Sequence, residues 1–405
     1  MNILMFSPSY GLAGGAVIAA NRLFHGLLFQ GADVKMLVGK MSGKNDRVNV
    51  IQHNFLGEKI LSRLTLALGL NYIHYYSSFR IPDYDFFKEA DVLNFHTIHS
   101  GYFNYLALPK LTRLKPAVFT LHDMWSFTGH CGFSYRCEKW KTGCGKCPYL
   151  NEYPSMKWDN SAFEWKLKKY IFKRSKISIV VPSKWLLSNA RQSILNHFTM
   201  HHIPNGLNLD TFRPLDQLQC KKMLNIPAEK KVLLFAAMGL SDHRKGGDLL
   251  YRSLCDLPQS MKKSVVLLTM GHPENSFRNM DIQTCNLGYI SGDGEKAVAF
   301  SAADLYLFPS RADNFPCIVQ ESIACGTPVV AFDVGGIPEL VRPGITGLLA
   351  VPGDTTDFLA RFTDLLDQDD YREKMRLNCR RVALEEYGID VQVKSYLKLF
   401  SSLVN

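Results

Sequence analysis

Short apolar runs alternate with helical segments along almost the whole chain, and this alternation constrains the fold more than any other feature. The runs expected to be strands form two sets, at residues 3–7, 34–38, 92–95, 118–121 and 177–181, and at residues 232–236, 265–269, 305–308 and 329–332. Such alternation is typical of parallel sheets that carry helices on both faces. We therefore predict an α/β fold with two doubly wound, Rossmann-type domains that face one another across a cleft.

A break between the two sets of strands marks the domain boundary. Residues 203–214 read IPNGLNLDTFRP, with turn-forming residues, two prolines and no apolar period, which is typical of a linker. The length of 405 residues also exceeds what one hydrophobic core usually organises. We predict an N-terminal domain over residues 1–204, a C-terminal domain over 205–383, and a helix over 384–405 that packs back on the N-terminal domain.

Net charge and hydrophobic pattern limit the classes of protein to which the chain can belong. The formal net charge of +10 suits nucleic acid, anionic lipid or a phosphate-bearing ligand. The longest apolar runs are far shorter than the ~20 residues that a membrane-spanning helix needs. The N-terminal residues MNILMFSP lack the basic region and the cleavage site of a signal peptide. We therefore expect a cytoplasmic protein.

The stretch SRADNFPCIVQESIACGTPVV, residues 310–330, places two acidic residues around the start of a short helix. Asp313 lies in the loop after an expected strand, and Glu321 lies one turn inside the helix. Ligands of open parallel sheets bind beyond the carboxyl ends of the strands. We therefore expect both carboxylates to face one ligand and to accept hydrogen bonds from its hydroxyl groups.

The start of the same helix favours an anion. Pro316 suits the first helical position, because its missing N–H costs nothing there. The amides of Cys317 and Ile318 would then lie at the helix N-terminus, where phosphate is favoured. Phosphate on these amides, with one polyol on each carboxylate, describes a nucleotide sugar. The alternative that the spacing leaves open is a capped core helix with a solvated Glu321.

Two further loops at the ends of expected strands carry groups that suit phosphate. In SDHRKGGDLL, residues 241–250, Arg244 and Lys245 precede a helix, so two cations and a positive helix end could meet a diphosphate. A solvated basic turn is the alternative. In the N-terminal loop SYGLAGGA, Gly14 and Gly15 open a helix and allow close approach of the backbone to an anionic ligand. This loop is not a GxGxxG motif.

Three histidines follow expected strands in the N-terminal half. His122, with Asp123 after it, ends the strand in TLHDMW, and His96 and His99 end the preceding strand in NFHTIHS. A histidine at a strand end can donate a hydrogen bond to a sugar hydroxyl or to phosphate. A single histidine is more often a structural hydrogen-bonding residue, so both interpretations stay open.

Together these motifs resemble the family-4 retaining glycosyltransferases of the GT-B fold. The resemblance rests on the paired-glycine loop, TLHD, IPNG, RKG, the spaced acidic pair with ACGTPVV behind it, and GGIPEL at residues 335–340. The segment from HDMWSFTGHC to GCGKCP resembles bacterial enzymes that build exopolysaccharide and O-antigen units, colanic acid transferases among them. The resemblance implies retaining transfer of a hexose from a nucleotide-diphosphate sugar to a glycan acceptor, which we expect to be lipid-linked.

The resemblance also implies a role for each site residue. The residues expected to act on the transferred hexose or its diphosphate, and so to be catalytic, are Lys245, Arg244, His122 and Asp313. The residues expected to bind the rest of the donor are Gly14, Gly15, Asn314, Phe315, Cys317, Ile318, Glu321 and Glu339. Within these sets Lys245 would bind the diphosphate, Glu321 the ribose and Asp313 the hexose, while Glu339 would shape the nucleotide pocket.

The sequence departs from the family pattern at three positions. Asp313 stands where Glu is usual, and Pro316 stands where Gly is common, which removes one amide donor. Gly239 stands where an Arg is common six residues before the Lys, so the diphosphate has one cation fewer and Arg244 gains importance. These departures leave the hexose and the nucleotide base of the donor open.

The resemblance also implies the mechanism. No strong nucleophile is identifiable, so the leaving phosphate would help to deprotonate the acceptor hydroxyl on the same face of the sugar. The protein would stabilise the developing charge with cations and amides, without a catalytic metal. Two alternatives remain: a nucleotide-sugar epimerase or hydrolase of the same fold, and a degenerate, non-catalytic subunit that binds nucleotide sugar.

Four of the ten cysteines cluster in an insert at residues 129–150 that lacks any apolar period. They are spaced C-x5-C-x6-C-x2-C, and they are Cys131, Cys137, Cys144 and Cys147. Disulfides are disfavoured in the cytoplasm, and four thiols so close together suggest tetrahedral zinc. We therefore predict a structural zinc ion, with free thiols and disulfides as alternatives.

Residues 158–174, WDNSAFEWKLKKYIFKR, interleave aromatic residues and lysines with helical spacing. This pattern fits an amphipathic helix on an anionic bilayer, which a lipid-linked acceptor would require. We therefore expect peripheral contact with the inner face of the plasma membrane. The alternative is a solvated basic face over a core. No recognised motif supports binding of nucleic acid.

Overall fold

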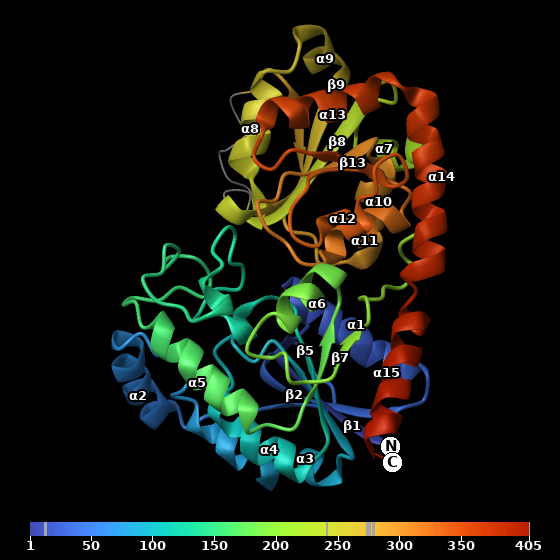
Figure 1. Ribbon diagram of the computed structural model, residues 1–405. Coiled ribbons are helices and arrows are strands. Elements are labelled where there is room, and N and C mark those ends of the chain that lie inside the picture. The colour runs from blue at the N-terminus through green and yellow to red at the C-terminus, as the bar shows by residue number, and fades with distance from the viewer. Residues whose placement is uncertain (12–13, 240–241, 273–276, 278–279, 405) are drawn as a thin grey trace. The chain divides into compact units, whose positions relative to one another are not determined.

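A computed structural model describes residues 1–11, 14–239, 242–272, 277 and 280–404 (Figure 1). Residues 12, 13 and 241, which belong to two of the predicted loops, lie outside the described residues. The chain forms two compact units: unit 1 comprises Met1–Gly206 and Asp390–Asn405, and unit 2 comprises Leu207–Ile389.

Unit 1 is built on a seven-stranded sheet in the order β3-β2-β1-β4-β5-β6-β7, with parallel pairing throughout. Its strands are β1 (Asn2–Tyr10), β2 (Asp33–Met41), β3 (Val48–Val50), β4 (Val92–His96), β5 (Ala117–Thr120), β6 (Ser178–Val181) and β7 (Met200–His202). The strand order reverses between β1 and β4. Their carboxyl ends therefore form a switch point, where open parallel sheets bind ligands.

Unit 1 also contains helices, and the C-terminal helix is one of them. They are α1 (Gly15–Phe29), α2 (Phe55–Ala67), α3 (Asp85–Glu89), α4 (Leu108–Leu114), α5 (Ser161–Lys173), α6 (Lys184–Arg191) and α15 (Ile389–Val404). Helix α15 is tied to the sheet because the Tyr396 hydroxyl lies 2.9 Å from Thr120 Oγ1 at the end of β5. Its Gln392 Oε1 also accepts a hydrogen bond from Gly206 N at 3.0 Å.

Unit 2 contains a six-stranded parallel sheet in the order β10-β9-β8-β11-β12-β13. Its strands are β8 (Lys231–Gly239), β9 (Val265–His272), β10 (Gln283–Asn286), β11 (Leu305–Phe308), β12 (Val329–Phe332) and β13 (Gly347–Ala350). Here the order reverses between β8 and β11, which gives this unit a switch point of its own.

Helices cover both faces of the sheet in unit 2 (Figure 1). They are α7 (Gln217–Met223), α8 (Gly247–Cys255), α9 (Gln259–Ser264), α10 (Asp293–Ala302), α11 (Cys317–Ala324), α12 (Ile337–Leu340), α13 (Thr355–Asp367) and α14 (Asp369–Glu386). Strand β8 is buried on both faces, which explains why its sequence is apolar without alternation. Leu234 packs in one core with α10, α11 and α14, whereas Leu233 packs in the other with α8 and α13.

The chain enters unit 2 at Leu207 and leaves it at Ile389, and these two segments are hydrogen-bonded. Leu207 N donates to Tyr387 O at 2.9 Å, and Ile389 N donates to Leu207 O at 3.1 Å. Among the described residues, no helix has the length and apolar composition to cross a bilayer. The two parallel sheets predicted from the sequence are present, and all nine expected strands belong to them.

Candidate active site

Two loops are joined at the switch point of unit 2, one after β8 and the other after β11. In the first, residues His243–Lys245 form a short 3-10 helix that ends at Gly246. The carbonyl of Arg244 accepts hydrogen bonds from Ser310 Oγ at 3.1 Å and from Arg311 N at 2.8 Å. A Cβ atom on Gly246 would lie 1.9 Å from Pro309 O, so only glycine permits this approach. The RKG turn is therefore held against the loop that carries the first acidic residue.

This junction brings both predicted cations onto one carboxylate. Lys245 Nζ lies 2.7 Å from Asp313 Oδ2, and Arg244 Nη1 lies 3.1 Å from the same oxygen. Burial by itself would raise the pKa of Asp313, but the charges of Lys245 and Arg244 outweigh burial and hold that pKa below its usual value. The three side chains form a largely buried cluster with a net charge of +1. The sequence placed them in one site but did not predict that they pair directly.

The loop after β12 closes against the same carboxylate-bearing residue. Gly336 N donates to Asp313 O at 3.1 Å. Gly335 has φ of 60°, and a Cβ atom on it would lie 2.1 Å from Asp313 O. The first glycine of GGIPEL is therefore required by this contact. It brings the start of α12, which contains Glu339 in its first turn, next to the loop of Asp313.

Helix α11 differs from the prediction at its first residue. Pro316 has an extended backbone (φ −67°, ψ 117°) and is the N-cap, so placing it at the first helical position was wrong. Its carbonyl already accepts hydrogen bonds from Val319 N and Gln320 N, as an N-cap carbonyl does. Cys317 and Ile318 form the first turn, as expected. Glu321 is buried, which excludes the alternative of a solvated Glu321.

Asn314 and Phe315, the other two predicted donor-binding residues in this loop, are also buried. The Phe315 ring packs edge-on against Tyr387, with ring centroids 6.4 Å apart. Phe315 therefore belongs to the core of unit 2, where it supports the loop.

The paired glycines lie at the switch point of unit 1, where α1 begins. Gly14 is the N-cap residue with φ of 126°, a conformation that other residues rarely adopt, and its carbonyl accepts a hydrogen bond from Ile18 N at 2.9 Å. A Cβ atom on Gly15, the first helical residue, would meet no atom of the described residues within 4 Å. Packing against the described part of the chain therefore does not require glycine at residue 15.

His122 ends a chain of hydrogen bonds that crosses the sheet of unit 1. Tyr396 lies 2.9 Å from Thr120 Oγ1, which donates to Asn94 Oδ1 at 3.2 Å. The amide of Asn94 donates to His96 Nε2 at 2.9 Å, so His96 carries its proton on Nδ1. That proton points to His122 Nε2, again at 2.9 Å. His122 is therefore the tautomer protonated on Nδ1.

Burial keeps both of these histidines neutral at physiological pH. It lowers the pKa of His122 to about 4, and it lowers the pKa of His96 well below the usual value. A neutral His122 can donate one hydrogen bond without carrying charge. His99 has a different environment: its Nε2 lies 3.0 Å from Asp123 Oδ2, and its ring stacks on Trp125 at 4.7 Å. No sequence motif indicated Tyr396, and Thr120, the first residue of TLHD, was given no role.

The two halves of the chain match two family models. Residues 13–211 match the model described as "Glycosyltransferase Family 4", and residues 216–382 match the model described as "Glycosyl transferases group 1". The chain belongs to the family-4 glycosyltransferases. This family-4 chain is 28% identical over 355 residues to the "Putative colanic acid biosynthesis glycosyl transferase WcaC" of Escherichia coli (strain K12), which covers 82% of this chain and 83% of that protein.

Solved structures share the fold of the family-4 chain over its whole length. Anabaena Alr3699/HepE in complex with UDP-glucose has a TM-score of 0.68 at 16% identity, covering 100% of both chains. WaaG, a glycosyltransferase involved in lipopolysaccharide biosynthesis, has a TM-score of 0.70 at 15% identity, covering 98% of this chain and 99% of that one. The predicted GT-B fold is confirmed.

The free energy of unfolding of this family-4 chain should fall as the pH drops from about 6.5 towards 4. In the unfolded state His122 has the ordinary pKa of 6.5, whereas burial lowers its pKa to about 4 in the fold. The unfolded state therefore takes up the proton first, and the stability present above pH 6.5 is lost on acidification. For His122 alone the loss is on the order of 3 kcal/mol.

Urea unfolding at about pH 7 and about pH 5 measures most of this loss, about 2 kcal/mol. His122→Asn keeps an acceptor for the Nδ1 proton of His96 and removes the titrating group. Its stability should therefore fall less steeply with acidification. An identical slope in wild type and variant would contradict a buried neutral His122.

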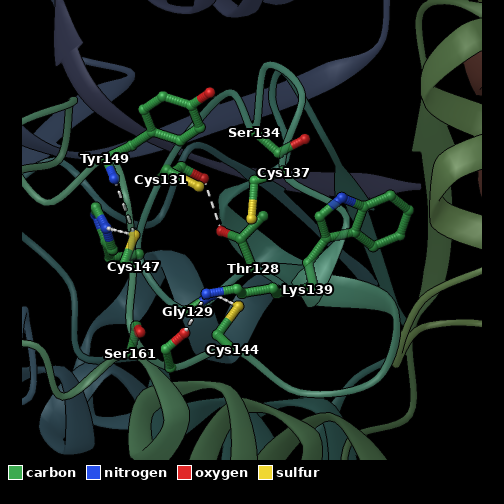
Figure 2. A pocket seen from close by; sticks show the side chains of 13 residues that line it. Thr128, Gly129, Cys131, Ser134, Cys137, Lys139, Cys144, Cys147, Tyr149 and Ser161 are labelled. Carbon is green, nitrogen blue, oxygen red and sulfur yellow. Dashed lines mark hydrogen bonds between the residues drawn. The ribbon is translucent and has the colours of Figure 1, made fainter.

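The four clustered cysteines of the family-4 chain line one small cavity of about 20 Å³ in unit 1 (Figure 2). This is enough for one water-sized occupant. Backbone amides point to two of the sulfur atoms: Gly129 N donates to Cys144 Sγ at 3.2 Å, and Tyr149 N donates to Cys147 Sγ at 3.5 Å. His130 Nε2 also lies 3.2 Å from Cys147 Sγ.

All ten cysteines are free thiols in this structure. Burial raises the pKa of Cys131 to about 12 and that of Cys144 to about 11, so both thiols are protonated near neutral pH. No group of three or more His, Cys, Asp or Glu side chains among the described residues is arranged to hold a metal ion. Zinc would therefore have to displace the protons and draw the sulfur atoms together. The zinc site remains a prediction.

Metal analysis of freshly reduced protein tests this prediction directly. We expect about one equivalent of zinc per chain, and its loss in Cys144→Ser with Cys147→Ser. Cys255→Ser, which changes an exposed thiol of unit 2, is the matched control and should retain the metal. Less than about a tenth of an equivalent in the wild type would exclude a structural zinc ion.

Most of the basic stretch at residues 158–174 forms helix α5, as predicted, but some of its lysine and aromatic side chains are buried. Lys168 is fully buried, and its Nζ donates to Trp125 O at 2.8 Å and to Thr128 O at 3.2 Å. Trp165 is buried as well, and its indole N–H donates to Trp140 O at 2.8 Å. These side chains hold the cysteine-rich insert and the segment before it to α5, so they are unavailable to a membrane.

Proposed function

We propose that this chain is a retaining hexosyltransferase that uses a nucleotide-diphosphate sugar and acts on a lipid-linked glycan during bacterial surface polysaccharide assembly. The observation that carries the proposal is the cluster of Arg244, Lys245 and Asp313 at the β8–β11 switch point. Two half-buried cations beyond the carboxyl ends of these strands suit a diphosphate. The WcaC and WaaG relatives support the polysaccharide context, and the UDP-glucose complex of HepE supports the class of donor.

In the proposed reaction the acceptor oxygen forms a bond to the anomeric carbon while the bond from that carbon to the leaving phosphate breaks. The acceptor hydroxyl passes its proton to the leaving phosphate on the same face of the sugar. Lys245 and Arg244 offset the negative charge that grows on the diphosphate. Asp313 holds both cations in position before the donor arrives, which limits the reorganisation needed during the reaction.

His122 has a supporting role in this proposal. It is neutral and protonated on Nδ1. In the proposal this N–H group donates a hydrogen bond to the nucleotide sugar and adds no positive charge to the site. The chain of hydrogen bonds from Tyr396 fixes that tautomer. The family resemblance implies no catalytic metal, and the two cations supply the positive charge.

A thermal-shift screen against UDP, GDP, ADP, CMP and their sugars tests the donor half of the proposal. Binding to the native state alone raises the unfolding temperature, and we expect a shift of several degrees with one nucleoside diphosphate. The donor found in this way is then incubated with membrane lipid extract, and a labelled glycolipid product is expected. No shift with any nucleotide would contradict the proposal. Release of free hexose, or its isomerisation, without transfer would favour the hydrolase or the epimerase.

A further inference from the structure

Helix α2 has its apolar residues on the outside. Leu56, Ile60 and Leu64 lie four residues apart on one face and are 74%, 63% and 62% exposed. Leu68, four residues after Leu64 and the C-cap residue of α2, is exposed too. A helix on a globular domain normally turns such a stripe towards the core. Four adjacent aliphatic side chains in water therefore call for a partner outside the unit.

The inner face of α2 is polar, and its buried contacts fix the rotation of the helix about its axis. Buried Glu58 accepts a hydrogen bond from Ser77 N at 2.7 Å, and its Oε2 lies 2.9 Å from His53 Nδ1. Buried Thr65 lies 3.1 Å from His74 Nδ1 through its hydroxyl group. Rotating the helix to bury its leucines would break these contacts and leave buried polar groups without partners. The orientation is therefore specified by the sequence.

The exposed stripe is flanked by positive charge. Lys59 and Arg63 are exposed and each directly precedes a residue of the stripe, whereas Glu58, the single acidic residue of α2, points inward. Near the C-terminal end of α2, Asn160 Nδ2 donates to Leu68 O at 3.0 Å. This contact brings up the segment of Trp158, whose side chain is 70% exposed. Tryptophan is a side chain that prefers the boundary between lipid and water.

We propose that α2 and the adjoining Trp158 segment form a surface that docks on an anionic lipid bilayer. The aliphatic stripe would enter the acyl boundary, Trp158 would lie at the level of the headgroups, and Lys59 and Arg63 would meet lipid phosphates. Long basic side chains reach headgroups while their aliphatic stems cover apolar surface. The net charge of +10 favours the same partner.

This inference rests on the proposed function, because a lipid-linked acceptor is reached at a bilayer surface. It moves the main contact from α5, where the sequence predicted it, to α2. On α5 the exposed residues Phe163, Lys166 and Tyr170 have the spacing of one helix face.

Sedimentation with lipid vesicles tests the docking surface. Wild-type protein is expected to bind vesicles with about 30% phosphatidylglycerol and to bind pure phosphatidylcholine vesicles much more weakly. The triple variant Leu56→Ser, Ile60→Ser, Leu64→Ser should lose at least roughly tenfold in vesicle affinity. Lys59→Gln with Arg63→Gln should weaken binding to the anionic vesicles and reduce its dependence on salt.

A matched control makes the same chemical change in unit 2. Leu218 on α7 and Leu377 and Leu384 on α14 are also exposed, and serine at all three should leave vesicle binding unchanged. Because all six residues are exposed, both triple variants should keep the wild-type circular dichroism. Both should also keep the thermal shift with the donor nucleotide, so a failure of docking is distinguishable from a failure of the proposed function.

Three results would overturn the proposal. The first is wild-type protein that does not sediment with anionic vesicles. The second is an α2 triple variant that binds them as well as the wild type. The third is a wild-type dimer, seen by light scattering, that the α2 variant converts to a monomer without changing its vesicle affinity, because the stripe would then be an interface between two copies.

Discussion

Replacement of Lys245 by alanine should lower turnover by about a hundredfold to a thousandfold, because in the proposed reaction Lys245 offsets the charge of the leaving diphosphate. The charge on the diphosphate grows as the glycosidic bond breaks, so the variant should lose more in kcat than in donor affinity. Arg244 stays 3.1 Å from Asp313 Oδ2 and keeps that carboxylate paired. The variant should therefore fold, and the loss should be chemical.

Initial rates of transfer with saturating donor and acceptor measure this effect. Donor affinity is followed separately by calorimetry. Lys263→Ala is the matched control. Lys263 is an exposed lysine on α9, directly before the amino end of β9, so its replacement should leave the rate unchanged. A turnover for Lys245→Ala within about threefold of the wild type would remove Lys245 from the donor site.

The sequence predicted the interior of both sheets but missed their edges, and the reason is physical. The four strands that were not expected, β3, β7, β10 and β13, are the outermost strands of the two sheets. Inner strands are buried on both faces and read as apolar runs. The outer strands read VNV, MHH, QTCN and GLLA, and three of them carry exposed or half-buried polar residues. A search for apolar runs cannot find such strands.

Site residues could be predicted where a motif lies at a strand end, but their contacts could not. Arg244 and Asp313 are far apart in the sequence, and they meet because β8 and β11 are neighbours in the sheet. Tyr396 is more distant still from His122, and it reaches that residue's hydrogen-bond chain only through the packing of α15. No spacing rule encodes either contact.

Helix α2 illustrates a different limit. Its sequence, FLGEKILSRLTLA, has one apolar and one polar face, and such a pattern normally predicts that the apolar face is buried. The buried contacts of Glu58 and Thr65 reverse that orientation. These contacts depend on residues 53, 74 and 77, whose positions follow from the fold.

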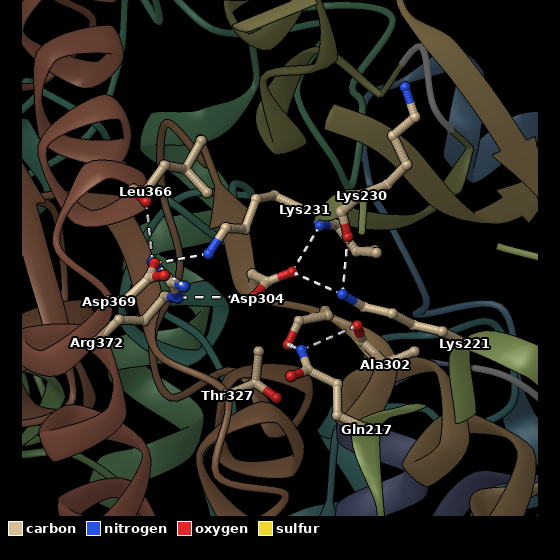
Figure 3. Close-up of polar contacts among 12 residues, drawn as sticks. Gln217, Lys221, Lys230, Lys231, Ala302, Asp304, Thr327, Leu366, Asp369 and Arg372 are labelled. Atoms are coloured by element: carbon tan, nitrogen blue, oxygen red, sulfur yellow. Dashed lines mark hydrogen bonds and ion pairs between the residues drawn. The ribbon is translucent and has the colours of Figure 1, made fainter. Parts of the chain in front are cut away.

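A second charge cluster lies at the amino ends of β8 and β11, and we interpret it as stabilising the fold of unit 2 (Figure 3). Asp304 directly precedes β11, is only 5% exposed and accepts a hydrogen bond from Val232 N at 2.7 Å. Lys221 Nζ lies 3.5 Å from its Oδ2, and Arg372 Nε lies 3.7 Å from its Oδ1. Both cations are buried, and Asp304 is the buried carboxylate that lies between them, while Arg372 also pairs with the exposed Asp369.

Asp304→Asn should therefore lower the free energy of unfolding by about 3 kcal/mol, because it removes the carboxylate that faces buried Lys221 and one of the two that face Arg372. The amide of asparagine can still accept the hydrogen bond from Val232 N, so the loss reports on charge and not on the end of β11.

Chemical unfolding followed by far-UV circular dichroism measures the loss in Asp304→Asn. Asp369→Asn is the matched control: Asp369 lies 2.6 Å from both Lys231 Nζ and Arg372 Nη2, but its side chain is 70% exposed. Water screens its charge, so its removal should cost no more than about 1 kcal/mol. Equal losses in the two variants would mean that burial does not set the strength of this cluster. Folded Asp304→Asn should still bind the donor nucleotide with wild-type affinity, because Arg244 and Lys245 lie beyond the other end of β8.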